Sequence, residues 1–165
     1  MRIPYFLIST ILVVVLAAAG CGSKIPPEVA DRVSWKGGFK TLQAAPDAYA
    51  GEFVILGGEI VRIENLQEHS EITVVQYPLD REKRPQPEKA SAGRFLIRSD
   101  SFLDPEIYEP GKLVTAAGEI MGAEKRAIGQ YLYEHPVIRG DLWVWEPRES
   151  SFPRFHFGLG VGKTF

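Results

Sequence analysis

GEFVILGGEI, at residues 51–60, and GKLVTAAGEI, at residues 111–120, form an internal repeat that decides the fold. Five of the ten positions are identical between the two copies. Both are rich in apolar residues and contain glycine, which is typical of a β-strand that bends where a side chain is missing. One repetition is too few for a solenoid. The repeat therefore indicates two equivalent strands of one closed sheet.

Five segments have the composition of strands, namely 53–64, 71–77, 93–98, 112–121 and 142–145. A short helix is expected between the third and fourth, because Asp104 can cap it and Pro105 suits the first helical position. The order predicts a mainly β fold, a small five-stranded Greek-key barrel of the OB type, whose first and fourth strands are neighbours. An open sandwich or a curved meander is the alternative.

Composition limits the classes of protein to which the chain can belong. Its 165 residues allow one compact domain, and 45% hydrophobic residues place it in the globular range. The formal net charge of −2 provides no global basic field, so we expect no nucleic-acid partner. The single cysteine excludes a disulfide framework and a multi-thiolate metal site.

The first twenty residues read as a signal peptide. Arg2 precedes an apolar run from Phe6 to Ala19, roughly 14 residues, which suits a signal sequence and is too short to span about 30 Å of hydrocarbon comfortably. Ala19, Gly20 and Cys21 then resemble a bacterial lipobox. We therefore expect lipidation of Cys21, with no cofactor apart from this covalent lipid. A buried free cysteine after an uncleaved anchor is the alternative.

The expected domain organisation has four parts. Residues 1–20 are the signal peptide, 21–38 the acylated cysteine and a flexible tether, 39–147 the barrel domain and 148–165 a glycine- and aromatic-rich tail. The Pro-Pro pair at 26–27 favours extended backbone and so indicates the tether. The tail is read as an extra strand, as a sticky segment for a membrane or partner, or as a signal for outer-membrane assembly.

Candidate chemistry is sparse. His69, His135 and His156 lack metal-ligand spacing, and we expect neither a metal site nor catalytic residues. Two glutamates at matching positions of the repeat, Glu59 and Glu119, could form a glycosidase pair, although solvent-facing positions are favoured. One possible ligand face remains. Trp143 and Trp145 share a side of the last strand and could stack a base or a sugar, although a core or rim role is favoured.

Six segments together resemble the Slp (starvation-inducible) outer-membrane lipoproteins, namely Gly57–Ile60, Tyr77–Asp80, Gly93–Phe95, Phe102–Tyr108, Val114–Gly118 and Trp143–Trp145. The resemblance runs from about Cys21 to Glu146. It implies an outer-membrane lipoprotein, associated with starvation or stress and without established enzymatic activity. The residue after the cysteine is Gly22. In lipoproteins retained in the inner membrane, aspartate is favoured at this position, so by resemblance Gly22 agrees with an outer-membrane location.

The leading hypothesis is therefore a lipid-anchored envelope protein, structural or interaction-mediating, with its mature domain in the periplasm. Its expected partners are the membrane, the lipoprotein processing and sorting machinery, and an envelope protein. The alternative is a tethered OB-like module that binds a small ligand, a glycan or a peptide. A hydrolase using Glu59 and Glu119 is a third and weaker hypothesis.

Overall fold

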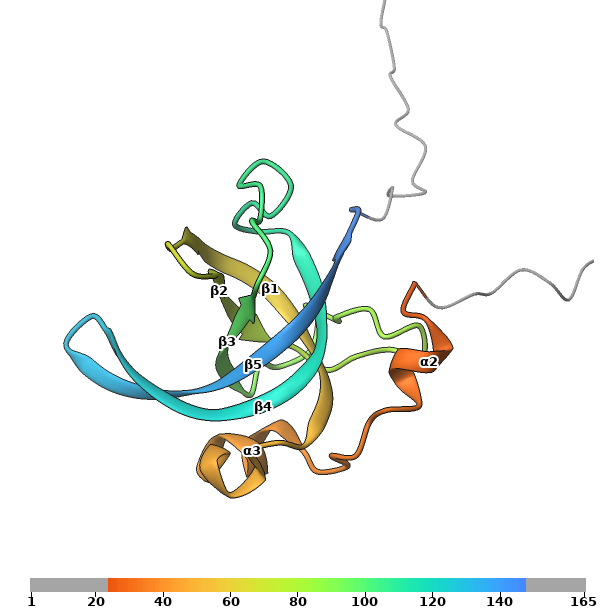
Figure 1. The fold of residues 1–165 in the computed structure, drawn as a ribbon, viewed down its shortest axis with the longest axis horizontal. Helices are drawn as coiled ribbons and strands as arrows, with labels where there is room; N and C mark the ends of the chain where they lie inside the picture. Colours follow the sequence, from red (N-terminus) through yellow and green to blue (C-terminus); the bar gives the residue numbers. More distant parts are fainter. Residues whose placement is uncertain (1–23, 148–165) are drawn as a thin grey trace, which may run out of the picture.

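The structure is a computed structural model that describes residues 24–147, so the signal peptide, Cys21 and the C-terminal tail lie outside the described residues. Three short helical segments precede the sheet. The elements are α2 (Pro27–Ala30), α3 (Phe39–Ala44), the 3₁₀ helix η1 (Pro46–Tyr49), β1 (Phe53–Asn65), β2 (Ser70–Gln76), β3 (Gly93–Ser99), β4 (Leu113–Ile128) and β5 (Tyr131–Trp145), as Figure 1 shows.

The five strands close into a barrel in the order β1-β2-β3-β5-β4, with β4 returning to β1. Neighbouring strands are antiparallel except β3 and β5, which run parallel. This order is that of an OB-type Greek-key barrel. The predicted mainly β, OB-like fold is confirmed, including the pairing of the first and fourth strands.

The two copies of the repeat pair with each other around a local twofold axis. Leu56 lies opposite Ala116, its own counterpart in the repeat. The N–H of Gly51 donates to the carbonyl of Ile120 at 2.8 Å, and the N–H of Gly111 donates to the carbonyl of Ile60 at the same distance. The repeat is therefore a structural device, in which one β-strand motif is used twice across one antiparallel interface.

A glycine retained in both copies lies where the barrel wall is tightest. A Cβ atom on Gly58 would lie 1.8 Å from the carbonyl oxygen of Val75 on β2. A Cβ atom on Gly118 would lie 2.1 Å from the carbonyl oxygen of Arg139 on β5. Only a residue without a side chain lets the adjacent strand approach this closely.

The core fills the barrel and extends to the segment before β1. Ile72 and Val74 on β2 and Phe95 and Ile97 on β3 alternate inward, and all four are fully buried. Phe39 and Leu42 of α3 join the same cluster, so this helix covers part of the barrel core.

Two expected boundaries were wrong. The helix expected at residues 104–108 is a single turn, in which Asp104 Oδ1 accepts from the N–H of Glu106 at 2.9 Å. The fifth strand begins at Tyr131 rather than residue 142, and β4 extends to Ile128. Together β4 and β5 form a long hairpin that projects to the left of the barrel in Figure 1.

Residues 24–38 do not form the expected free tether. Ile25 is only 1% exposed, and Lys24 Nζ donates to the carbonyl of Val144 at 2.5 Å. The backbone N–H groups of Ser34 and Trp35 both donate to the carbonyl of Phe53 at 3.1 Å. The Pro-Pro pair permits this packing, because proline is tolerated at the first position of the short helix α2.

Candidate functional site

A buried ion-pair cluster joins the β4–β5 hairpin to the outer side of β2 and β3. Glu71 is 2% exposed, and its two carboxylate oxygens accept from Arg98 Nε at 2.9 Å and Arg126 Nη1 at 2.6 Å. Glu124 accepts from Arg126 Nη2 at 2.7 Å and also pairs with Arg98. Two arginines thus share two carboxylates, which neutralises the charges that the fold buries.

The titration of Glu124 reflects this pairing. Burial alone would raise its pKa, but hydrogen bonds from Arg126 and Arg98 outweigh burial and lower the pKa below its usual value. The pKa of Arg126 is raised, because its carboxylate partners outweigh the opposing effect of burial. Glu124 and Arg126 therefore stay ionised at neutral pH, and their pair has the properties of a structural lock rather than of a proton donor.

His135 of β5 lies beside this cluster and is 2% exposed. Its Nδ1 is 3.1 Å from the carbonyl oxygen of Tyr133, which can only accept, so Nδ1 carries the proton. Burial lowers the pKa of His135, and the positive charges of Arg126 and Arg94 lower it further. The imidazole is therefore neutral at physiological pH.

We expect stability to fall as the pH decreases from about 6.5 toward the lowered pKa of His135. In that window the unfolded chain binds a proton that the folded chain does not, so the slope reaches up to about 1.4 kcal/mol per pH unit. Urea unfolding across this range measures the slope. His135→Gln should flatten it and His69→Gln should not; an unchanged slope in His135→Gln would assign the effect to other groups.

A groove of about 300 Å³ lies between the hairpin and the outer side of β1, β2 and β3. Its charged lining consists of Arg62, Arg94, Arg126 and Glu64, with His135 beside them. Val61, Thr73 and Ile128 add apolar and hydroxyl groups. We call this hollow the arginine groove. Its lining offers more positive than negative side chains.

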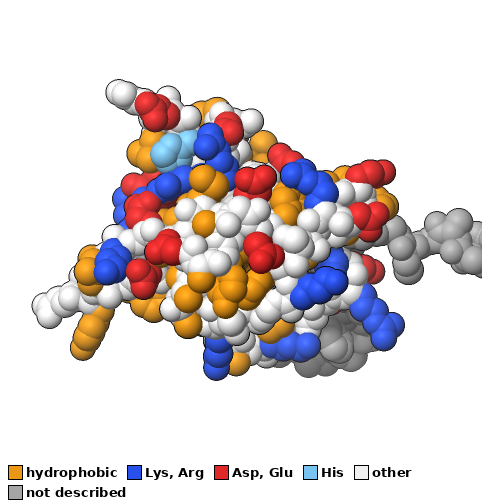
Figure 2. Space-filling view, turned by 60° about the horizontal axis from the view of Figure 1, so that its bottom comes forward, with side chains coloured by type: hydrophobic (Ala, Val, Ile, Leu, Met, Phe, Trp, Pro, Cys, Tyr) orange, Lys and Arg blue, Asp and Glu red, His pale blue; other side chains and the backbone are white. Residues whose placement is uncertain are grey.

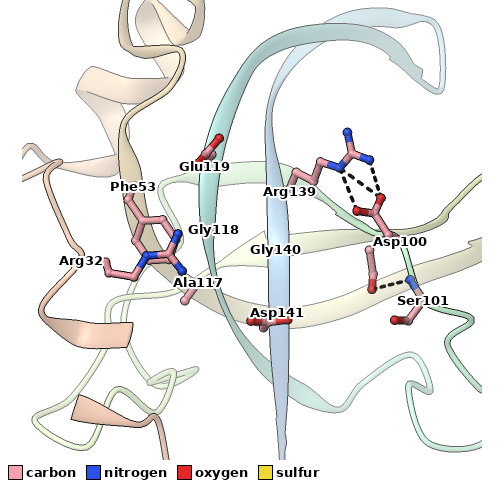
Figure 3. A pocket seen from close by; sticks show the side chains of 11 residues that line it. Arg32, Phe53, Asp100, Ser101, Ala117, Gly118, Glu119, Arg139, Gly140 and Asp141 are labelled. Atoms are coloured by element: carbon pink, nitrogen blue, oxygen red, sulfur yellow. Dashed lines mark hydrogen bonds and ion pairs between the residues drawn. The ribbon is translucent and has the colours of Figure 1, made fainter. Parts of the chain in front are cut away.

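A second hollow, of about 310 Å³, lies over the glycine crossing of β4 and β5 (Figure 3). On one side Arg32 stacks on Phe53, with the guanidinium 4.1 Å from the ring centroid. On the other side Arg139 pairs with Asp100 at 2.6 Å. Arg139 therefore already has a carboxylate partner, whereas the partner of Arg32 is an aromatic ring.

The tryptophan face is covered by the chain itself. Trp145 is 8% exposed, and its Nε1 donates to Thr115 Oγ1 at 2.9 Å. Lys24 and Arg84 lie 5.6 and 5.4 Å from its ring centroid. Trp143, two residues earlier, is half-buried. The contacts of Trp145 hold the N-terminal segment to the end of β5 and leave little of its ring open for stacking.

Glu59 and Glu119 do not come together. The repeat pairs antiparallel, so Glu59 lies opposite Leu113 while Glu119 lies opposite Phe53, six residues along β1 from Glu59. Six residues of strand extend about 20 Å, well beyond the roughly 9.5 Å limit for a glycosidase pair. The weak hydrolase hypothesis is therefore wrong.

Across residues 24–147 the structure contains no group of three or more His, Cys, Asp or Glu side chains able to hold a metal ion. Within the same range, no helix is long and apolar enough to cross a bilayer. Cys21 and His156, both named from the sequence, fall outside the described residues. Figure 2 shows acidic and basic side chains interspersed over the face that it presents, around a gathering of hydrophobic ones.

Sequence reasoning missed the ion-pair cluster. Glu71 directly precedes the β-branched run of β2, and Arg98 ends the apolar run of the next strand. A charged residue at the start of a strand gives no sign of burial, so the buried position of Glu71 could not have been inferred from this pattern. Its partner Arg126 gave no signal either, since residues 122–128 read as a polar loop.

The fold and these sites define a small OB-like barrel module whose buried charges are paired with one another. The chain belongs to the outer membrane lipoprotein Slp family, whose sequence model matches residues 18–158. The resemblance seen in the sequence is thereby confirmed. The protein is an outer-membrane lipoprotein.

Among similar curated proteins, the uncharacterised lipoprotein YeaY of Escherichia coli K12 is 34% identical over 98 residues, 59% of this chain and 50% of YeaY. An uncharacterised protein of Haemophilus influenzae is 33% identical over 56% of this chain and 51% of its own length. Outer membrane protein Slp of E. coli is 28% identical over 74% of this chain and 67% of its own. The matches span about half of the first two relatives.

Two solved structures are similar at low identity. Schizosaccharomyces pombe Pot1pC bound to ssDNA shares 7% identity, with a TM-score of 0.30, over 61% of this chain and 82% of that chain. The Plasmodium falciparum SSB complex with ssDNA shares 15%, with a TM-score of 0.31, over 57% and 94%. The exclusion of nucleic acid from the expected partners is corrected, because proteins of similar fold hold ssDNA. This likeness assigns no ligand to the present chain.

Proposed function

We propose that the chain is a non-enzymatic lipoprotein, anchored through lipid on Cys21, that mediates contacts at the outer membrane. The observation that carries this proposal is the burial of Ile25, four residues after Cys21, next to Lys24, which donates to the carbonyl of Val144 at the end of β5. A domain fixed this close to its acylation site is held at the membrane surface. Expression under starvation or stress, which the family resemblance implies, forms part of the same proposal.

The pairing of the buried charged groups supports a non-catalytic role. The carboxylate of Glu71 binds two arginines, and Glu124 shares them. A general acid or base needs a pKa near the working pH. Glu124 has a lowered pKa instead, which suits a permanently ionised structural partner.

Cys21→Ser is expected to abolish lipidation and leave an unprocessed precursor that retains residues 1–20. The thiol is the only group in the lipobox that can form the thioether, and several acyl chains are needed for firm anchoring. Intact-mass measurement of the membrane-extracted protein gives the result directly. Ser23→Ala is the matched control and should be processed normally. Normal processing and membrane retention of Cys21→Ser would contradict the proposal.

A second candidate function, a membrane-tethered binding module, is favoured by the arginine groove. OB-type barrels bind ligands on the face of strands 2 and 3, between the β1–β2 and β4–β5 loops. The groove occupies this place, with Thr73 of β2 and Arg94 of β3 on its floor side and residues 126–129 of the hairpin facing them. Trp143 and Trp145, proposed from the sequence as the ligand face, lie outside it.

A further inference from the structure

The three arginines of the arginine groove differ in what they contact. Arg62 donates to Glu64 at 2.8 Å, and Arg126 is held by Glu71 and Glu124 of the ion-pair cluster. The side chain of Arg94 is half-buried and forms no hydrogen bond or ion pair with another of residues 24–147. A partly desolvated guanidinium without an anion is costly, and it has five donors to offer.

The surroundings of Arg94 are positive. Its neighbour His135 has a lowered pKa, first through burial and then through the charges of Arg126 and Arg94. Each carboxylate nearest the groove is already shared with an arginine, Glu64 with Arg62 and the cluster carboxylates with Arg126. An incoming anion would therefore meet Arg94 without displacing an existing ion pair.

We propose that the arginine groove binds a small polar molecule through an oxyanion, a phosphate or a carboxylate, with Arg94 as the principal contact. The planar guanidinium matches both oxyanions through two parallel N–H···O bonds. Thr73 supplies a hydroxyl, and Val61 and Ile128 supply apolar surface for the rest of the molecule. The groove volume of about 300 Å³ suits a small ligand. This inference rests on the second candidate function and names its ligand class.

Calorimetric titration of the full lipidated protein in detergent micelles tests the proposal. The probes are glucose 1-phosphate, glucuronate and neutral glucose, each at low salt. We expect saturable binding of at least one charged sugar and none of glucose. Arg94→Gln should weaken binding by about tenfold or more, as for loss of a charged hydrogen bond. Arg94→Lys should restore part of it, because the charge returns without the planar fork.

Arg32→Gln is the matched control, because Arg32 borders the other hollow, where it stacks on Phe53. It should change affinity less than twofold. Urea unfolding of each variant confirms that it folds, which we expect for Arg94→Gln because no ion pair is lost. The two charged probes separate phosphate from carboxylate as the preferred oxyanion.

Several results would overturn the proposal. They are no saturable binding of either charged sugar, equal affinity in wild type and Arg94→Gln, or binding of an ssDNA oligonucleotide alone. If neutral glucose bound, and only substitutions in the groove abolished its binding, the binding module would stand and the proposed oxyanion ligand would be rejected. None of these results bears on the lipoprotein proposal, which the processing of Cys21→Ser tests separately.

Discussion

Glu71→Gln is expected to destabilise the barrel by about 2–3 kcal/mol, because it removes the buried carboxylate that binds two arginines and leaves Glu124 alone to pair with them. Glu71 is 2% exposed and accepts from Arg98 and Arg126, which come from different strands. The amide cannot balance two guanidinium groups, and one of its atoms is a donor facing donors. The urea midpoint, with an unchanged m-value, measures the loss.

Glu64→Gln is the matched control, because Glu64 is one third exposed and contacts Arg126 only at 3.8 Å. Exposed pairs of this kind contribute about 0–1 kcal/mol. If Glu71→Gln and Glu64→Gln shifted the urea midpoint equally, the cluster would not be the lock between the hairpin and the barrel. A double substitution of Glu71 and Arg98 by apolar residues should recover part of the loss, since it removes both charges together.

Gly58→Ala and Gly118→Ala should each cost roughly 2–3 kcal/mol, at the upper end of overpacking. Each new Cβ would lie near 2 Å from a carbonyl oxygen of the adjacent strand, at 1.8 Å for Gly58 and 2.1 Å for Gly118. Backbone cannot rotate out of the way as a side chain can, so the strands must separate. Thermal unfolding of the two variants measures the loss of stability at each of the two symmetry-related positions.

Gly38→Ala tests whether the cost comes from the close approach of strands. No heavy atom lies within 4 Å of a Cβ atom on Gly38, so this substitution should be nearly neutral. Because Gly58 and Gly118 occupy equivalent places around the local axis, similar losses are expected. A loss of stability in only one of the two variants would show that the local twofold symmetry of the backbone is not matched by the packing around these glycines.

The sequence was enough for the barrel because short-range signals and the closed topology agree. The repeat at 51–60 and 111–120 marks the two strands that must be neighbours, and glycine in both copies marks where each bends. Alternating apolar residues of β2 and β3 predict their inward faces. An OB-type order then leaves few ways to close the sheet.

The parts that were missed depend on contacts between distant segments. Residues 122–128 carry charges that read as a loop, yet Arg126 faces a buried partner on β2 and stays in a strand. Ile25 lies in a polar, proline-rich stretch with no periodicity, so no local pattern predicts that it is buried. Within the described residues the Arg94 side chain has no ion pair because of where the β4–β5 hairpin lies. No local pattern in the sequence specifies that position.

Burial of Ile25 also determines how the domain can move. With lipid on Cys21, only three residues separate the acylated cysteine from the buried Ile25, and the four Cα–Cα steps between them span about 14 Å at full extension. The barrel then stays close to the bilayer surface. It meets partner molecules there by diffusion in two dimensions. In Figure 1 the β4–β5 hairpin lies across the barrel from the start of the described chain, so it extends away from the end that is nearest to Cys21 in the sequence.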